Sequence, residues 1–271
     1  MIKNGEELDL PFGEVKQPRR LETMHTFFSG TTGAGKTVFL SHIIERIILR
    51  GDRTIIHDCK GDFIPRFYRP GQDFIFNPLD ARCVGWNIFN EIKTPMDIDA
   101  IGISLIPEAK NSEPYWSNAA RDVFCGAMHY CWQHNLRTNR GLWEVLTDET
   151  EQLALKLKNT VGAEAGHKAI QDPHGKQAQS VISTLLQYIK AFQYFSHQEG
   201  TFSIREFMAY GDGNIFISSH EEVRETMRPI ISLFIDLLGR AMLSLPISPM
   251  RRVFFLIDEL GNLQQLPTLV R

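Results

Sequence analysis

The sequence of 271 residues lacks the marks of several protein classes. It has only four cysteines and no C-x-x-C pair, which excludes a disulfide-stabilised scaffold. No segment approaches the roughly 18 apolar residues of a transmembrane helix, and the polar, acidic N-terminus does not resemble a signal peptide. Basic charge is not in excess, because 29 Lys+Arg face 32 Asp+Glu. This balance argues against a surface coated with nucleic acid but leaves a local basic channel possible.

The amino-acid composition of the chain is ordinary for a globular protein. Hydrophobic residues make up 43% of the chain and charged residues 23%, so a disordered, collagen-like or coiled-coil protein is excluded. The length suffices for one large domain or two smaller ones, each with a substantial core. Composition alone therefore predicts a soluble intracellular globular protein.

Short apolar segments alternate with a helical pattern in the first part of the chain. Thr23–Ser29 is expected to form a short buried strand, and Lys36–Arg50 a helix that Gly51 ends. Thr54–His57 and Phe74–Phe76 are expected to be further strands. A strand, a helix and a strand joined by tight loops predict a parallel α/β sheet.

Helical patterns dominate the middle of the chain, and strand signals return near its end. Helices are expected at Asn118–His134, Gly141–Lys158, Gln177–Phe195 and from about Glu221 to Leu245, and strands at Asn214–Ser218 and Val253–Ile257. We therefore expect an α/β domain, formed by residues 1–92 and 198–271, with an inserted all-α domain over residues 93–197.

An eight-residue segment, GTTGAGKT, matches the phosphate-loop pattern G-x-x-x-x-G-K-[ST] between a predicted strand and a predicted helix. Its glycines allow the backbone N–H groups to turn inward, and the helix presents its positive end to the same anion. Lys36 is expected to reach the phosphates and act in catalysis, and the Thr37 hydroxyl to bind Mg²⁺. The predicted nucleotide-binding residues are Gly30, Thr31, Thr32, Gly33, Ala34, Gly35, Lys36 and Thr37.

The strand Val253–Ile257 runs directly into two acids, Asp258 and Glu259. ATPases with a phosphate loop place such acids beside Mg²⁺ at the carboxyl end of a strand. Asp258 is expected to hold the Mg²⁺ through water, and Glu259 to orient and deprotonate the attacking water. The alternative is an acidic pair that caps the next helix. ATP and Mg²⁺ are therefore the expected cofactors.

A second group of charged residues follows a strand at Asp58–Asp62. Its acids and Lys60 could lie at the carboxyl edge of the sheet, or the segment could simply be a turn in which Gly61 takes a positive φ. The residues themselves do not decide between these readings.

Seven segments together resemble the TraD-type coupling proteins of conjugative type IV secretion, similar to TrwB. The phosphate loop and the Asp-Glu strand end would fit many ATPases, but NPLDAR with GWN and the LPTLV tail are more particular. The resembling segments are GTTGAGKT (30–37), RGDRTIIHDCKGDF (50–63), FNPLDARCVGWNIFNE (76–91), PYWSNAAR (114–121), NIFISS (214–219), RPIIS (228–232) and FFLIDELGNLQQLPTLV (254–270).

The resemblance implies a RecA-like nucleotide-binding domain with an all-α insertion. It also implies a homo-hexameric ATPase at the cytoplasmic face of the bacterial inner membrane. Such an ATPase moves relaxase-bound single-stranded DNA toward the type IV secretion channel. No basic run or aromatic-interleaved strand marks a DNA surface in this sequence, so the DNA expectation rests on the resemblance.

Two features depart from the family pattern. The sequence contains no membrane helices, and the strands and the trans-acting arginine of the family would follow beyond Arg271. We therefore expect a piece of a longer protein that is poorly soluble and weakly active alone, because a sheet without its neighbouring strands exposes apolar surface and unpaired edges. A soluble, fully active monomer would refute this.

Two other functions fit the motifs. One is another phosphate-loop ATPase, which would be either a secretion ATPase that handles only protein or a DNA pump of chromosome segregation or repair. The helical insertion disfavours the DNA pump. The other is a docking module that binds nucleotide without turnover.

Overall fold

The computed structural model describes residues 9–31, 33–109, 113–195, 200–248 and 251–268. The chain divides into two compact units. The first comprises residues 1–76, 212–219 and 247–260, and the second comprises residues 77–211, 220–246 and 261–271. The domain boundaries expected after residues 92 and 197 stay predictions.

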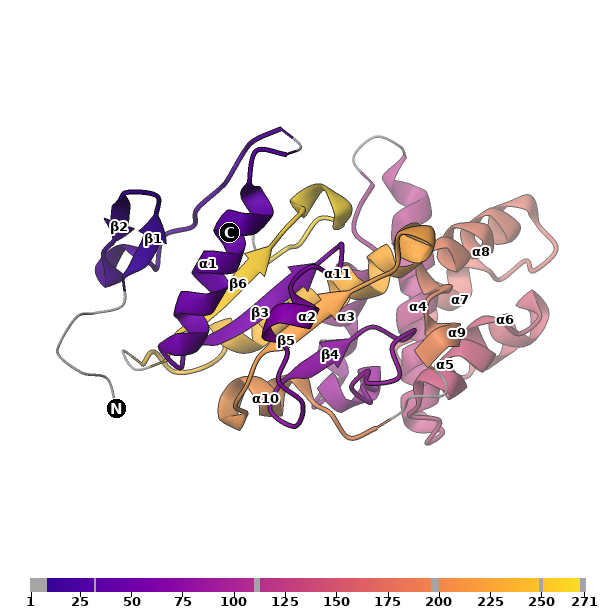
Figure 1. The fold of residues 1–271 in the computed structure, drawn as a ribbon. Helices are drawn as coiled ribbons and strands as arrows, with labels where there is room; N and C mark the ends of the chain where they lie inside the picture. The colour runs from indigo at the N-terminus through magenta and orange to yellow at the C-terminus, as the bar shows by residue number, and fades with distance from the viewer. Residues whose placement is uncertain (1–8, 32, 110–112, 196–199, 249–250, 269–271) are drawn as a thin grey trace. The chain divides into compact units, whose positions relative to one another are not determined.

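A four-stranded parallel sheet is the centre of the first unit (Figure 1). Its strands stand in the order β4-β5-β3-β6, so β3 is flanked by two strands that come much later in the chain. Asp58 at the end of β3 aligns with Ser218, and His57 aligns with Ile257. Four of the five predicted strands are confirmed, and they pair in parallel. Their bounds are β3 (Arg53–Asp58), β4 (Phe74–Phe76), β5 (Ile215–Ser218) and β6 (Val253–Ile257).

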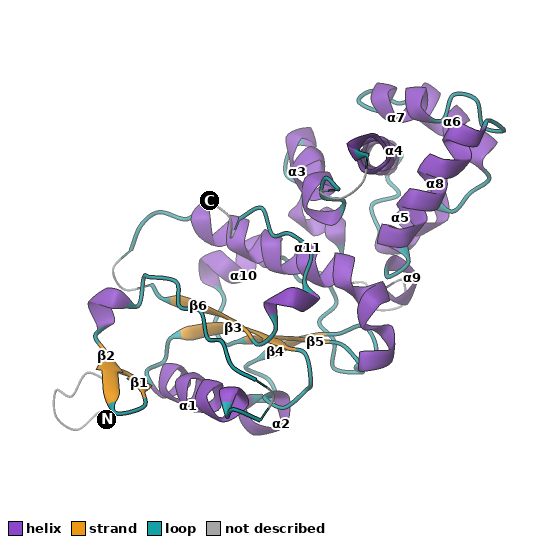
Figure 2. Ribbon diagram, turned by 90° about the horizontal axis from the view of Figure 1, so that it is seen from above, coloured by secondary structure: helices purple, strands orange, loops and turns teal. Residues whose placement is uncertain are grey.

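Two helices of the first unit, α1 (Lys36–Leu49) and α2 (Ile64–Phe67), lie on the same face of this sheet (Figure 2). Leu40 and Ile44 of α1 belong to a buried apolar cluster. Its other buried members come from the strands and the loop before α2: Ile56, Phe63, Ile75 and Phe216. Burial of this apolar stripe, spaced one helical turn apart, fixes α1 on the sheet. The predicted helix is confirmed, and Gly51 follows it with a φ of 77°.

The strand expected at Thr23–Ser29 is wrong. The segment is exposed and has no regular structure, and Phe27 is 80% accessible. A strand forms only where its backbone finds a partner, and no strand pairs with this segment in the described part of the chain. Phe28 still contacts Phe39 of α1, with ring centroids 4.7 Å apart. The apolar residues therefore pack as side chains without joining the sheet.

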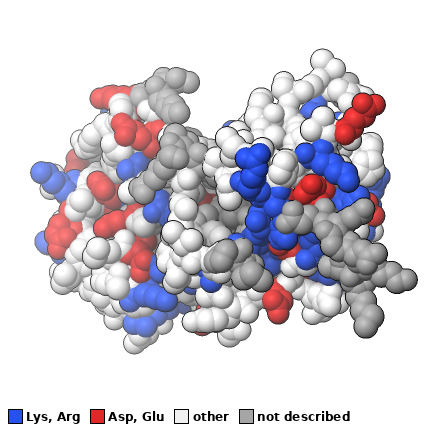
Figure 3. All heavy atoms as spheres, turned by 90° about the vertical axis from the view of Figure 1, so that its left-hand side faces the viewer, with Lys and Arg blue, Asp and Glu red and all other residues white. Residues whose placement is uncertain are grey.

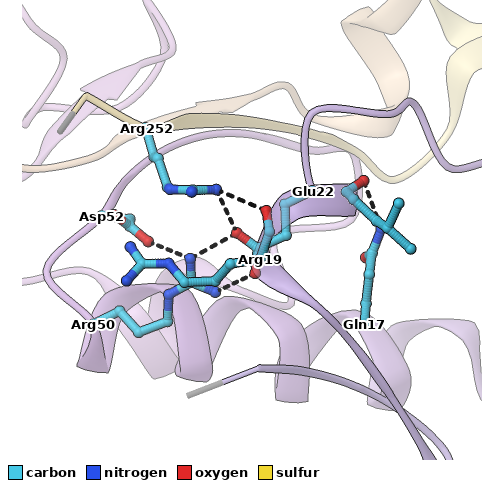
Figure 4. Close-up of polar contacts among 7 residues, drawn as sticks. Gln17, Arg19, Glu22, Arg50, Asp52 and Arg252 are labelled. Atoms are coloured by element: carbon cyan, nitrogen blue, oxygen red, sulfur yellow. Dashed lines mark hydrogen bonds and ion pairs between the residues drawn. The ribbon is translucent and has the colours of Figure 1, made fainter. Parts of the chain in front are cut away.

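An antiparallel hairpin of β1 (Leu10–Phe12) and β2 (Val15–Gln17) precedes this segment, and Gly13 at its turn has a φ of 70°. After it comes η1 (Arg19–Leu21), followed by Glu22. The Glu22 side chain is 1% exposed and accepts hydrogen bonds from Arg50 Nη1 (2.7 Å), Arg50 Nη2 (2.8 Å) and Arg252 Nη1 (3.0 Å) (Figure 4). One carboxylate thus joins the chain before the phosphate loop to the end of α1 and the start of β6.

Glu22→Gln is expected to lower the free energy of unfolding by about 1.5–3 kcal/mol, because it weakens the buried hydrogen bonds to Arg50 and Arg252 and leaves Asp52 as the acidic partner of Arg50. Chemical denaturation of both proteins measures this loss. Glu14 is exposed on the hairpin turn, and Glu14→Gln serves as the control with an expected change within about 0.5 kcal/mol. An equal, small loss for both variants would show that the Glu22 ion pairs do not stabilise the fold.

The second unit is helical and has no β-strand among its described residues. Within it, α4 packs against α3, α5, α6, α7 and α8, while α11 packs against α3, α8 and α10. The bounds are η2 (Ile88–Glu91), α3 (Pro95–Leu105), α4 (Pro114–Gln133), α5 (Asn139–Leu146), α6 (Thr150–Lys158), α7 (Glu164–Ala169), α8 (Lys176–Ile189), α9 (Phe192–Phe195), α10 (Ile204–Tyr210), η3 (Glu221–Val223) and α11 (Arg224–Leu243). Where the structure describes the chain, none of its helices has the length and apolarity of a membrane crossing.

Two predicted helices are each divided in two. The stretch expected over Gln177–Phe195 ends as α8 at Ile189 and restarts as α9 at Phe192. The stretch expected over Gly141–Lys158 ends as α5 at Leu146 and restarts as α6 at Thr150. Asp148 lies in the gap, where its carboxylate accepts bonds from Glu149 N (2.9 Å) and Lys156 Nζ (2.5 Å). An aspartate that bonds to nearby backbone and side-chain donors favours a turn over a continuous helix.

Candidate nucleotide site

The glycine-rich loop has the backbone that its sequence predicts. Gly33 and Gly35 have φ values of 81° and 84°, which side-chain-bearing residues rarely adopt. Gly35 is also the N-cap of α1, and the first turn of the helix holds no acidic side chain. The N–H groups of a first helical turn lack acceptors within the helix. The loop therefore leads into a helix end that suits an anion.

The predicted nucleotide-binding residues lie together around this helix end. Gly30, Thr31, Gly33, Ala34 and Gly35 are exposed, and Thr32 lies outside the described residues. The Lys36 and Thr37 side chains begin α1 and are half-buried. In addition, Lys36 Nζ donates to the carbonyl oxygens of Gly30 (2.5 Å) and Thr31 (3.1 Å). The ammonium group is thus held across the mouth of the loop by neutral acceptors, which a phosphate oxygen can replace.

The phosphate loop lies at the carboxyl end of the sheet. A short turn joins the end of α1 to the start of β3, where Asp52 N donates to Ile47 O (3.2 Å). Because α1 packs on β3 and returns through this turn, the two elements run in opposite directions. The N-terminus of α1 therefore lies at the end where β3 and β6 finish, as Figure 1 shows. This is the edge at which open α/β sheets bind ligands.

Asp258 and Glu259 follow β6 at that same edge. Asp258 N donates to His57 O (3.3 Å), which continues the pairing of β6 with β3 by one step. The Asp258 side chain is half-buried, whereas Glu259 is exposed. Burial raises the pKa of Asp258 above its usual value, and neighbouring carboxylates raise it further, although Lys60 opposes them. A partly buried carboxylate among like charges suits a bound cation.

The segment Asp58–Asp62 is a turn, and it lies at the carboxyl edge of the sheet. The two interpretations of its sequence, a turn and a group of charges at that edge, therefore both hold. Gly61 has a φ of 76°, and the buried Asp58 carboxylate accepts bonds from Asp62 N (3.0 Å), Phe63 N (2.9 Å) and Ile64 N (3.0 Å). Burial raises the pKa of Asp58, and these N–H bonds oppose the rise. Its charged neighbours Asp62 and Lys60 act on Asp258 electrostatically. The sequence did not reveal that Lys60 offsets charge at Asp258.

Asp258→Asn is expected to raise the melting temperature of the metal-free protein at pH 7. A carboxyl group whose pKa is raised by folding binds its proton more tightly in the folded state, so its ionisation costs stability as the pH rises. The difference in melting temperature between the variant and wild type should shrink as the pH falls toward about 4, which is the pKa of an aspartate in an unfolded chain.

Thermal melts of wild type and variant from about pH 3.5 to pH 7, a range that begins below the pKa of an unfolded aspartate, measure this difference. Asp62→Asn is the matched control, because Asp62 is exposed and carries a charge of the same cluster. An Asp258→Asn advantage that stays constant with pH would contradict the electrostatic cause.

The amino ends of the strands form a different region, where two arginines and two aspartates line a cavity. A cavity of about 460 Å³ lies there between the end of α1 and the starts of β3, β4 and β5, with Arg53 and Arg69 in its lining. Burial lowers the pKa of Arg53, and the nearby Arg251 lowers it further. Figure 3 views the molecule from the hairpin side and shows Lys and Arg side chains gathered on part of this face. The cavity is at the opposite end from the phosphate loop, so it is not the nucleotide site.

The residues at the carboxyl edge fit a nucleotide with Mg²⁺. The positive-φ glycines and the open first turn of α1 accommodate a polyphosphate, and Lys36 adds a cation beside it. Thr37 and Asp258 supply oxygen ligands, which Mg²⁺ prefers. Within the described residues no group of three or more His, Cys, Asp or Glu side chains is arranged to hold a metal. A site of one hydroxyl and one carboxylate is consistent with this, because Mg²⁺ in such sites takes its remaining ligands from phosphate and water.

Comparison with known proteins agrees with this geometry. Residues 9–271 match the family described as the type IV secretion-system coupling protein DNA-binding domain. Coupling protein TraD of Escherichia coli (strain K12) is 31% identical over 277 residues, an alignment that covers 99% of this chain and 38% of TraD.

Two solved structures of the plasmid coupling protein TrwB superpose with a TM-score of 0.87 at 30% identity, one with ADP and Mg²⁺ and the other with a non-hydrolysable ATP analogue. In each case the match covers 98% of this chain and 64% of TrwB. The sheet, the helices and the superposition together confirm the predicted RecA-like α/β fold. This chain belongs to the TraD- and TrwB-type family of type IV secretion coupling proteins.

Proposed function

We propose that this chain binds Mg²⁺ and ATP at Gly30–Thr37 and hydrolyses the nucleotide to drive DNA transfer in conjugation. The observation that carries the proposal is the joint placement of the loop, the N-terminus of α1 and Asp258 at one edge of the sheet. Structures of TrwB with ADP and Mg²⁺ and with an ATP analogue support it. The chain spans 38% of TraD, so the activity of a whole coupling protein enters here as a proposal.

Each side chain has a separate task in this proposal. Lys36 exchanges its two carbonyl partners for phosphate oxygens, and the first N–H groups of α1 bind the same phosphates. Thr37 and Asp258 hold Mg²⁺, the latter through water. When bound, Mg²⁺ supplies positive charge that neutralises the phosphate oxygens. Glu259 accepts a proton from the attacking water, for which its exposed position beside the sheet edge leaves room.

The finer parts of the proposal follow the family. The substrate is relaxase-bound single-stranded DNA, and the partners are the relaxase and the components of the type IV secretion channel. The working assembly is a homo-hexamer at the cytoplasmic face of the inner membrane. A match to a DNA-binding domain family and identity to TraD support a role with DNA and a secretion system.

ATP hydrolysis measured with and without single- and double-stranded DNA tests this function. We expect turnover that requires Mg²⁺, rises severalfold with DNA and is lost in Lys36→Ala. Turnover that ignores DNA would instead favour a secretion ATPase that handles protein. Nucleotide binding without turnover, under all conditions, would favour the docking module.

A further inference from the structure

Three phenylalanine rings, here called the ring cluster, meet beside the phosphate loop, and each comes from a different segment of the first unit. Phe12 ends β1, Phe28 lies just before the loop, and Phe39 lies in the first turn of α1. The ring centroids of Phe28 and Phe39 are 4.7 Å apart. Phe12 lies 5.6 Å from Phe28 and 5.5 Å from Phe39 by the same measure. Aromatic rings attract one another at these separations.

Phe28 and Phe39 stand on the two sides of the phosphate loop. Phe28 lies two residues before Gly30. Phe39 lies two residues after Thr37, and its N–H donates to Gly35 O (2.9 Å). The contact between the two rings therefore holds together the chain that enters the loop and the chain that leaves it.

A second tie across the loop is given up when a nucleotide binds as proposed. Lys36 Nζ donates to the carbonyl oxygens of Gly30 and Thr31, and in the nucleotide complex phosphate oxygens replace these acceptors. The ring contact uses no group that a phosphate would engage, so it persists in that complex. A loop whose ends stay together loses less conformational freedom on binding than a loop whose ends separate. The ring contact thus favours the binding-competent loop.

The N-terminal hairpin supplies the third ring and is itself packed on α1. Leu10 of β1 is 4% exposed and forms a buried cluster with Ile43 and Ile47 of α1. Phe12 and Phe39 pack against this cluster. Leu10 and Phe12 are two residues apart on β1, so their side chains lie on the same face of the strand. One face of the hairpin therefore joins the buried cluster on α1 to the ring cluster at the loop.

We propose that the ring cluster preorganises the phosphate loop and couples the N-terminal hairpin to nucleotide affinity, which makes Phe12 a positioning residue. This inference rests on the proposed nucleotide site. When the loop binds well only while the hairpin is packed on α1, the affinity falls in proportion to the packed fraction. Coupling is reciprocal, so bound nucleotide favours the packed hairpin by the same factor.

Four variants separate this coupling from general stability. Phe12→Ala removes one ring from the cluster, and Phe12→Tyr keeps a ring there. Phe27→Ala is the matched control, because Phe27 adjoins Phe28 in the chain but is 80% exposed. Ile75→Val removes one methylene from the buried cluster between α1 and the sheet, so it lowers stability while it leaves the hairpin and the rings unchanged.

The experiment measures ADP affinity with Mg²⁺, kcat and KM for ATP, and backbone hydrogen exchange of residues 10–17 with and without ADP and Mg²⁺. We expect Phe12→Ala to weaken ADP affinity and to raise KM about five- to tenfold, with kcat within about twofold of wild type. ADP and Mg²⁺ should slow hairpin exchange about fivefold or more in wild type but hardly at all in Phe12→Ala. Phe12→Tyr should restore both, and Phe27→Ala and Ile75→Val should keep the wild-type affinity.

Three results would overturn the inference. Unchanged ADP affinity in Phe12→Ala would show that the hairpin ring does not preorganise the loop, and an equal loss in Ile75→Val would show that affinity follows general stability. Hairpin exchange in wild type that ignores bound ADP would show that the two are not coupled. Failure of the proposed nucleotide site looks different, because wild type and Lys36→Ala would then bind ADP equally, whatever the exchange of the hairpin.

Discussion

Lys36→Ala is expected to lower ATP turnover by at least about 100-fold and to remove most of the affinity for nucleotide. The ammonium group lies at the mouth of the phosphate loop, where it now bonds the carbonyl oxygens of Gly30 and Thr31. Losing one positively charged group aimed at the reacting phosphates typically costs about 100- to 1,000-fold. Steady-state turnover, together with the shift in melting temperature that ADP and Mg²⁺ produce, measures both effects.

The control for this variant is Lys16→Ala, because Lys16 is an exposed lysine on β2 and far along the chain from the loop. Its turnover and its nucleotide-dependent melting shift should match wild type. Lys36→Ala should also melt near wild type without nucleotide, since among the described residues Lys36 does not belong to either apolar cluster around α1. A Lys36→Ala protein that still gains stability from ADP and Mg²⁺ would place the nucleotide elsewhere.

Glu259→Gln is expected to separate binding from hydrolysis. The glutamine keeps the size of the side chain but cannot accept a proton from water, and general-base catalysis contributes about 100- to 10,000-fold. Turnover should therefore fall by that order, while affinity for ADP and Mg²⁺ stays near wild type. Single-turnover measurements with ATP would show nucleotide bound and not cleaved.

Glu222→Gln gives a matched control, because Glu222 is an exposed glutamate outside the predicted site. Glu259 is exposed as well, so neither change should affect the melting temperature greatly. Equal turnover in Glu259→Gln and wild type would assign the general base to another group, of which Asp258 is the nearest along the chain.

Local patterns predicted the strands of the sheet and the backbone of the glycine-rich loop well. The turn of the phosphate loop requires residues that can adopt a positive φ. Gly33 and Gly35 adopt φ values of 81° and 84°. The strands β4 and β6 begin and end where their apolar runs do. In these cases the physical cause, backbone freedom or burial of an apolar run, lies within a few residues of the chain.

Features that depend on distant partners could not be predicted in this way. Thr23–Ser29 has the composition of a buried strand, but pairing requires a neighbour that the segment itself does not specify. Asp236 is an acid within an apolar helical pattern, and nothing local shows that Ser104 and Thr268 donate to it. Glu22 likewise gains its role from Arg50 and Arg252, which arrive from remote parts of the chain.

We propose that the loop before α1 and the acid after β6 form one site for nucleotide and Mg²⁺. Calorimetric titration of ADP into the chain, with Mg²⁺ and then with EDTA, tests it most directly when wild type is compared with Asp258→Asn. We expect one ADP to bind per chain. Mg²⁺ should raise the affinity for ADP in wild type, and it should raise that affinity much less in Asp258→Asn. Binding that is absent, or that responds to Mg²⁺ equally in both proteins, would show that the loop and Asp258 do not form one nucleotide site.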